Sequence, residues 1–180
     1  MAHCIWCSDS ERSLLSERKT GVIHCPNSNF NLKSGVLNVR ALLAAGIKVG
    51  LGTDVAGGSS PSMLDAIRQA VVASKLVEAG MGNITCNESE TLANQKKALS
   101  YTEAFYLATL GSARCLGLEN KIGNFKVGKE FDALVVNVHA PNGPIDAPEN
   151  ESPMDSFQRF LFIGDDRNIT RVFVKGKQVI

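Results

Sequence analysis

Asp54 is the residue in this sequence best placed to carry out chemistry. It follows a short apolar run at residues 47–51 and precedes two glycines, Gly57 and Gly58, and a long helical pattern. A short apolar run bounded by turn residues and followed by a helix is typical of a buried parallel strand. In α/β folds, polar residues at the carboxyl ends of such strands bind ligands and perform reactions. The sequence therefore predicts that Asp54 lies in a functional site.

The alternative role for Asp54 is to cap the helix that follows it, as strand-end aspartates often do. A separate start signal argues against that role. Ser60 is predicted as the N-cap and Pro61 as the first helical residue, and apolar residues then recur at helical spacing as far as Ala79. Asp54 is therefore not needed as a cap.

Histidines and cysteines give weaker signals. His3 lies in residues 1–6, which are predicted to be the end of a strand. His24 closes a second short apolar run; it either supports the site or, as we prefer, packs as a core residue. Cys4 and Cys7 form one Cys-x-x-Cys pair beside His3. A single pair is a weak indication of a metal or redox site, and chance or core packing is the simpler interpretation.

Hydrophobic spacing predicts three strand–helix units in the first part of the chain. Apolar runs end near His3, at Cys25 and before Asp54, and a helical pattern follows each run. The segment NSNFN at residues 27–31 is rich in turn-forming residues. The three predicted helices cover residues 8–18, 32–45 and 61–79. Strands that alternate with helices indicate a parallel α/β sheet.

A loop or short irregular helix is predicted over residues 80–97. Ser100 and Glu103 then have the spacing of a capping box, which starts a predicted helix that ends near Leu116. This helix is the last element of the α/β part.

The pattern becomes β-rich after Leu118. The predicted elements are β runs at residues 123–129 and 132–138, a helix at 156–163, and a hairpin that turns at Lys175 and Gly176. We therefore expect two parts, an α/β part over residues 1–118 and a small β-rich part over residues 119–180.

Composition narrows the class of protein. The chain has 180 residues, of which 44% are hydrophobic and 21% charged, as in ordinary globular proteins. A net charge of +1 gives no reason to expect a nucleic acid or a membrane surface as partner. There is no apolar run of about 20 residues and no signal-peptide core. Five cysteines without a framework favour a reducing compartment, so we expect a cytoplasmic protein.

Three motifs together resemble one enzyme family. They are His3 at a strand end, the HCPNSN segment at residues 24–29 and the GTD triplet at 52–54. This combination is similar to the C-terminal half of zinc-dependent amidohydrolases of the deaminase branch. VGKEFDALVV and the final V-K-G-K hairpin look like the segment that completes the small β-sandwich domain of that family. LGTDVAGGSSPSMLDAIRQAV and FLFIGDDRNITRVFVKGKQV extend the resemblance to the guanine-deaminating members over nearly the whole chain.

The resemblance implies a (β/α)₈ barrel. Residues 1–118 would be its last three strand–helix units, and residues 119–180 the C-terminal strands of the composite β-sandwich. Asp54 would be a zinc ligand at the end of the eighth strand, and His3, at the end of the sixth, would hold the attacking hydroxide or the purine. Both would be catalytic and would contact the substrate. Zinc lowers the pKa of its bound water to about 7, and a nearby carboxylate can accept the proton.

The implied reaction is hydrolytic deamination of guanine to xanthine and ammonia, by an enzyme that is a homodimer when full length. The chain departs from the family pattern because its three histidines, His3, His24 and His139, include no His-x-His. A catalytic zinc normally has three protein ligands, and the resemblance places only Asp54 here. We therefore expect a C-terminal portion or truncated gene product that is inactive alone.

Two alternatives remain open. One is an amidohydrolase that acts on another heterocycle, such as a pterin, cytosine or a triazine. The other is a non-catalytic half-barrel that depends on a partner chain.

Overall fold

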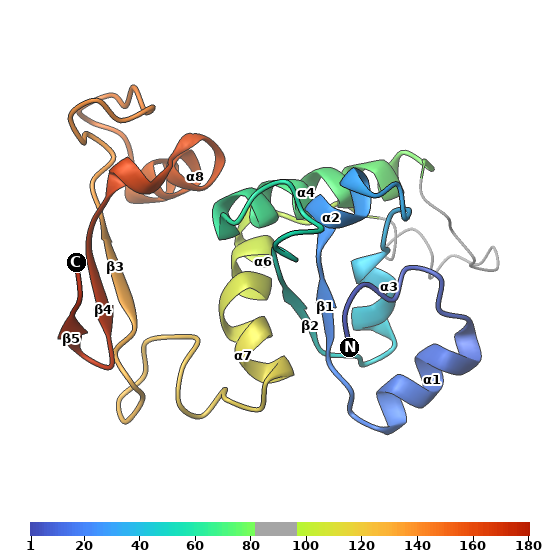
Figure 1. The fold of residues 1–180 in the computed structure, drawn as a ribbon. Coiled ribbons are helices and arrows are strands. Elements are labelled where there is room, and N and C mark those ends of the chain that lie inside the picture. The colour runs from blue at the N-terminus through green and yellow to red at the C-terminus, as the bar shows by residue number, and fades with distance from the viewer. Residues whose placement is uncertain (82–96) are drawn as a thin grey trace. The chain divides into compact units, whose positions relative to one another are not determined.

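The computed structural model describes residues 1–81 and 97–180, which fall into two separate units (Figure 1). The first unit is Met1–Glu119 and the second is Asn120–Ile180. The loop predicted over residues 80–97 lies almost entirely outside the described residues. Within the described ranges, every helix is too short or too polar to cross a bilayer. That the units belong to a barrel and a β-sandwich remains a prediction.

A parallel sheet forms the centre of the first unit. Strands β1 (Val22–His24) and β2 (Val49–Leu51) pair in parallel along their full length. Ala2 adds a parallel bridge to Ile23, so the predicted strand at residues 1–6 is reduced to one bridge. Three chain segments therefore run in the same direction, and their carboxyl ends meet at one edge, as the alternation of strands and helices predicts.

Helices α1 (Asp9–Glu17) and α4 (Met63–Glu78) lie close to their predicted positions, with one correction. The N-cap of α4 is Ser62, so the predicted start at Ser60 and Pro61 is wrong. The Ser60 hydroxyl instead accepts a hydrogen bond from the backbone N–H of Ser62 at 3.2 Å. That bond forms a turn in front of the helix, because serine side chains readily pair with nearby backbone groups.

Two segments after β1 differ from expectation. The predicted NSNFN turn is the helix α2 (Pro26–Asn31), whose proline occupies the first turn, where a missing N–H costs no hydrogen bond. The helix predicted over residues 32–45 is only α3 (Val39–Ala44). Asn38 fixes its start, because the Asn38 side chain accepts a hydrogen bond from the N–H of Ala41 at 3.0 Å.

The helix predicted to end near residue 116 is interrupted. It consists of α6 (Tyr101–Tyr106), the π-helical turn η1 (Leu107–Gly111) and α7 (Ser112–Cys115), and the predicted capping box at its start is present. The Ser112 hydroxyl accepts a hydrogen bond from the backbone N–H of Leu51 at 3.1 Å. The π turn thus immediately precedes the residue through which this helix hydrogen-bonds to the backbone of β2.

The second unit contains a three-stranded antiparallel sheet. Its strands pair in the order β3 (Ala133–Val136), β4 (Ile169–Val174) and β5 (Lys177–Gln178), and its helices are α8 (Pro153–Ile163) and the short 3₁₀ turn η2 (Asp166–Asn168). The predicted hairpin turn at Lys175 and Gly176 is confirmed. The β run predicted over residues 123–129 forms no strand, because Gly123 and Gly128 have positive φ and turn the chain.

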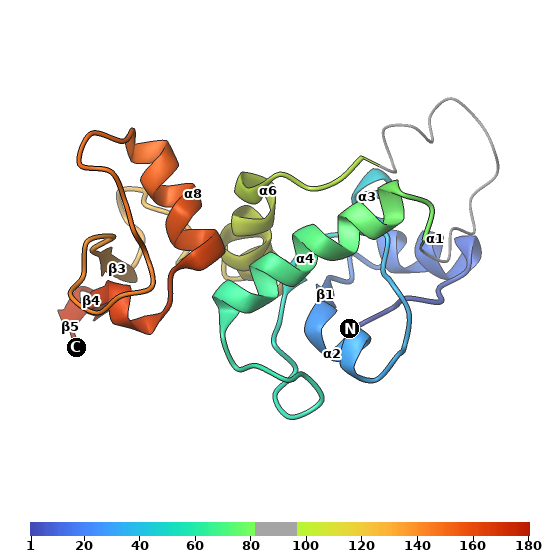
Figure 2. The same cartoon turned by 90° about the horizontal axis from the view of Figure 1, so that it is seen from above.

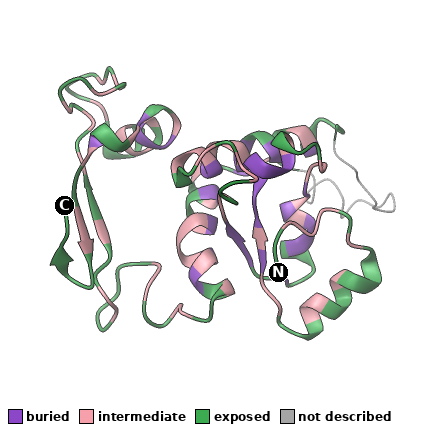
Figure 3. Ribbon diagram, in the orientation of Figure 1, coloured by how far each residue is buried: buried purple, intermediate pink, exposed green. Residues whose placement is uncertain are grey.

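Burial differs between the two units (Figure 3). All residues of β2 are buried, and helix α4 packs against α2 and α6 (Figures 1 and 2). In contrast, no residue of strands β3 to β5 is buried. Leu134, Val135 and Val174 are exposed on these strands, and Trp6 is exposed in the first unit. Both units therefore leave apolar surface uncovered.

The 180-residue chain alone is expected not to unfold as a cooperative monomer. Leaving roughly 200 Å² of apolar surface in water forgoes about 5 kcal/mol at about 25 cal/mol per Å². Net stabilities are only about 5–15 kcal/mol. Thermal unfolding combined with sedimentation should show a molten, aggregated or partner-dependent chain. A sharp transition from a monomer would contradict this and identify a self-sufficient domain.

Candidate functional site

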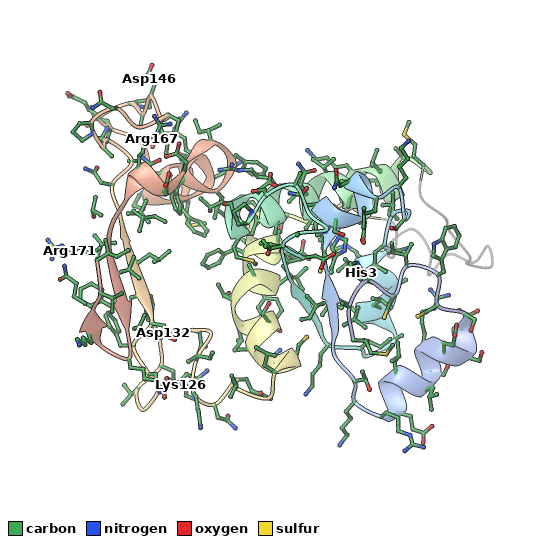
Figure 4. The ribbon with its side chains drawn as sticks, viewed as in Figure 1. His3, Lys126, Asp132, Asp146, Arg167 and Arg171 are labelled. Atoms are coloured by element: carbon green, nitrogen blue, oxygen red, sulfur yellow. The ribbon has the colours of Figure 1, made fainter. Side chains whose placement is uncertain are left out.

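Asp54 and His3 lie at the carboxyl ends of neighbouring parallel segments. Asp54 comes three residues after the last residue of β2, and its backbone is left-handed with φ 49°. Its carbonyl accepts a hydrogen bond from the N–H of Gly58 at 2.7 Å, which closes the turn after the strand. His3, whose side chain is labelled in Figure 4, has φ 66° and donates its backbone N–H to the carbonyl of Ile23 of β1 at 2.9 Å. Strained backbone of this kind is concentrated at functional sites.

The structure brings the two side chains together. Nε2 of His3 lies 3.6 Å from Oδ2 of Asp54, and the two side chains are 38% and 37% exposed. This separation is too long for a hydrogen bond, but it allows an ion pair when the imidazole is protonated. A carboxylate and an imidazole that share one solvent-accessible edge can accept, hold and donate protons.

The loop after Asp54 is held by asparagines of α2. Oδ1 of Asn27 accepts hydrogen bonds from the hydroxyl of Ser59 at 2.6 Å and from its backbone N–H at 3.3 Å. Nδ2 of Asn27 also donates to Asp65 in α4. Asn31 donates to the carbonyl of Gly57 at 2.9 Å. No role was predicted for these asparagines, although their spacing, four residues apart in NSNFN, was a usable signal.

The two glycines of this loop permit close approach. A Cβ at Gly57 would lie 2.7 Å from Oδ2 of Asp54 and 3.0 Å from Oγ of Ser28. A Cβ at Gly58 would overlap the carbonyl oxygen of Thr53. Larger residues here would therefore displace the Asp54 carboxylate or its backbone.

His24 is a neutral buried residue. Its side chain is enclosed beneath the site, and burial, with a smaller contribution from charge on His3, lowers its pKa to about 3. Neither ring nitrogen has a hydrogen-bond partner among the described residues. Its burial agrees with its interpretation as a packed core residue, whereas two buried ring nitrogens without a partner in the described part of the chain are unusual for one. The neighbouring Cys25 thiol is also neutral, because burial and then the Asp54 charge raise its pKa to about 11.

Cys4 and Cys7 are free, half-buried thiols. Burial raises the pKa of Cys4, and the nearby Cys7 raises it further, so Cys4 is a poor thiolate. Across residues 1–81 and 97–180, no three His, Cys, Asp or Glu side chains are grouped so that they could hold a metal ion. Asp54 fits the chemistry of a zinc ligand, but the described residues do not complete a zinc site.

Parallel strands with polar residues gathered at their carboxyl ends define an α/β protein of the kind that includes the barrel hydrolases. The comparison with protein families is more specific, because residues 1–179 match the amidohydrolase family. The chain belongs to the amidohydrolase family.

Individual relatives agree with this assignment. The guanine deaminase of Mus musculus is 48% identical over the whole chain, which covers 38% of that relative. A crystal structure of guanine deaminase from C. acetobutylicum, with guanine bound in its active site, has a TM-score of 0.81 and 36% identity. That match covers 100% of this chain and 38% of the other.

A more distant structure, an adenosine deaminase from Xanthomonas campestris with bound zinc, has a TM-score of 0.74 and 27% identity. The match covers 98% of this chain and 36% of the X. campestris chain. The chain thus spans well under half the length of the relatives it matches.

After dialysis, the 180-residue chain is expected to retain well below one zinc ion per molecule. Asp54 offers one ligand, whereas a catalytic zinc normally has three protein ligands. Metal analysis by mass spectrometry checks this. Stoichiometric zinc would be contrary to expectation. If the double variant Cys4→Ser/Cys7→Ser then lost that zinc, it would identify the cysteine pair as the site.

Gly58→Ala is expected to lower catalytic efficiency by about 100-fold, because a displacement of about 1 Å at a reacting group can cost that much. The measurement uses an exchange protein, in which these 180 residues replace the matching segment of the mouse guanine deaminase, assayed with guanine. Gly117→Ala is the contrasting control, because Gly117 has a left-handed backbone, with φ 69°, and open space around it, whereas Gly58 is crowded but has no left-handed backbone. Equal losses in the two variants would contradict the steric explanation for Gly58.

Proposed function

We propose that these 180 residues form the C-terminal part of a barrel enzyme that hydrolytically deaminates guanine to xanthine and ammonia. The observation that carries the proposal is the pairing of the Asp54 carboxylate with the His3 imidazole, 3.6 Å apart at the strand ends. The 48% identity to a guanine deaminase along the whole chain supports guanine as the substrate. So does the guanine bound to the C. acetobutylicum structure.

Asp54 and His3 have distinct roles in this proposal. The Asp54 carboxylate accepts the proton of the attacking water, because its side chain is solvent-accessible and lies at the strand end. The His3 imidazole holds the water or the purine by a hydrogen bond. The backbone turn that Gly58 closes onto Asp54 keeps the carboxylate in place.

Zinc is the proposed cofactor, and when bound it supplies a water that is acidic enough to react at neutral pH. The zinc in the X. campestris relative supports this choice. Asp54 would be one ligand, and the others would come from outside these 180 residues. We therefore propose that the chain alone does not catalyse the reaction.

The two units have separate places in the proposed enzyme. Residues 1–118 would supply the last three strand–helix units of the barrel, since three parallel segments with following helices are present in the first unit. Residues 119–180 would supply strands of the small β-sandwich, which would cover the sheet of β3 to β5 that is uncovered within its own unit.

The test is the exchange protein with Asp54→Ala. We expect the unsubstituted exchange protein to deaminate guanine, and we expect Asp54→Ala to lower turnover by at least the roughly 10²- to 10⁴-fold that a general base contributes. Zinc content should fall in the same variant. Asp9→Ala is the matched control, because Asp9 is an exposed carboxylate of α1 that pairs with Arg12.

Three outcomes would contradict the proposal. Near-normal turnover by the Asp54→Ala variant would show that the Asp54 carboxylate is not needed for the reaction. Faster turnover of a pterin, cytosine or a triazine than of guanine would show that guanine is not the preferred substrate. A folded, zinc-containing exchange protein without deaminase activity would favour the non-catalytic half-barrel.

A further inference from the structure

His3 needs an external support to present its ring in one orientation. It is in a segment that forms only one bridge to the sheet, and both His3 and Cys4 have left-handed backbones, with φ 66° and 55°. Its side chain is 38% exposed, so packing alone does not fix the ring. A functional imidazole in such a position is usually oriented by a hydrogen bond to its second nitrogen.

Asn29 makes that hydrogen bond. Its Oδ1 lies 2.9 Å from Nδ1 of His3, on the opposite side of the ring from the nitrogen that faces Asp54. An amide oxygen only accepts hydrogen bonds, so this contact places the proton of the neutral ring on Nδ1. Nε2 is then the nitrogen with the free lone pair, and it lies 3.6 Å from the Asp54 carboxylate.

Asn29 is itself rigidly held. It is 1% exposed, its backbone N–H donates to Cys25 at 3.1 Å, and its carbonyl accepts from Ser34 at 2.8 Å. Its Nδ2 has no hydrogen-bond partner among the described residues, so the contact with His3 is the amide's one side-chain hydrogen bond there. The buried side-chain oxygen of Asn29 therefore has His3 as its hydrogen-bond partner.

We propose that Asn29 is the positioning residue for His3. By accepting the Nδ1 proton, it fixes the plane of the imidazole and its tautomer, and it directs the Nε2 lone pair toward the edge occupied by Asp54. Helix α2 thus supports both groups, since Asn27 and Asn31 of the same helix hold the loop after Asp54. The catalytic consequence rests on the proposed deamination, whereas the proton position does not.

The consequence for the reaction is a defined direction of hydrogen bonding. A neutral His3 whose Nε2 is free accepts a hydrogen bond from a water or from an N–H of the purine. If the tautomer were reversed, Nε2 would present a proton to the same groups and the hydrogen bond would run in the opposite direction. Without Asn29 the ring would rotate and both tautomers would be populated, so fewer molecules would have the reactive arrangement.

The test reads the tautomer directly. In the exchange protein with ¹⁵N-labelled histidine, long-range ¹H–¹⁵N spectra are recorded over a range of pH, and the tautomer is read where the spectra themselves show His3 to be neutral. His3→Gln identifies the His3 signals by their loss. We expect a protonated Nδ1 and an unprotonated Nε2. A proton on Nε2 in the unsubstituted protein would overturn the proposal, whatever the variants do.

Two variants of Asn29 separate positioning from packing. Asn29→Leu keeps the size of the side chain and removes the acceptor, so the His3 signals should shift toward a mixture of tautomers. The value of kcat should fall by about 10- to 100-fold, as is typical when the partner of a functional histidine is lost, while KM changes less. Asn29→Asp retains an acceptor and should keep the Nδ1 proton. Unchanged tautomer and kcat in Asn29→Leu would contradict the proposal.

Failure of this inference is distinguishable from failure of the proposed function. If the unsubstituted exchange protein does not deaminate guanine, the proposed function fails, but the tautomer of His3 is still measured. If it does deaminate guanine and Asn29→Leu changes neither the tautomer nor kcat, only the inference about Asn29 fails.

Discussion

The hydrogen bonds of the six-residue helix α2 are the constraint on which the candidate site depends. Its buried asparagine Asn29 contacts His3, while Asn27 contacts Ser59 in the loop that follows Asp54. Two groups that are 51 residues apart in sequence, at positions 3 and 54, are thus tied to one short helix. Because asparagine carries both a donor and an acceptor, a few buried amides can fix several loops at once.

The same region explains why the loop after β2 contains two glycines. The Asp54 carboxylate approaches Gly57 so closely that a Cβ there would lie 2.7 Å from it. Ser112 supports the sheet from the other side by satisfying the edge of β2, at the point where η1 interrupts the helix. These local contacts surround the site, even though the chain spans only 38% of a relative such as the mouse guanine deaminase.

Several features were predictable from sequence because their causes are local. The apolar run before Asp54, the capping box at Ser100 and the turn at Gly176 each depend on residues within a few positions of one another. Asp54 could be singled out for the same reason, since a strand followed by a polar residue and glycines predicts its position. The roles assigned to Asp54 and His3 came from the family resemblance and remain proposals.

Other features depend on contacts between distant segments, and they could not be predicted. The NSNFN segment was expected to form a turn because asparagine and serine pair with nearby backbone groups. It forms a helix in which Asn27 and Asn29 contact Ser59 and His3 instead. The predicted start of α4 at Ser60 was wrong, because the helix begins after Ser62 and the Ser60 hydroxyl accepts a hydrogen bond from Ser62 instead. Ser112, the first residue of α7 after the π turn, pairs with Leu51 of β2, 61 residues away.

The central claim is that Asp54 lies at the metal of a deaminase active site. The most direct test is a crystal structure of the exchange protein, with anomalous diffraction measured at the zinc absorption edge. We predict a zinc peak about 2.0–2.2 Å from a carboxylate oxygen of Asp54, the usual zinc–oxygen distance in proteins. A fully occupied zinc that lies beyond direct contact with Asp54 would contradict the account.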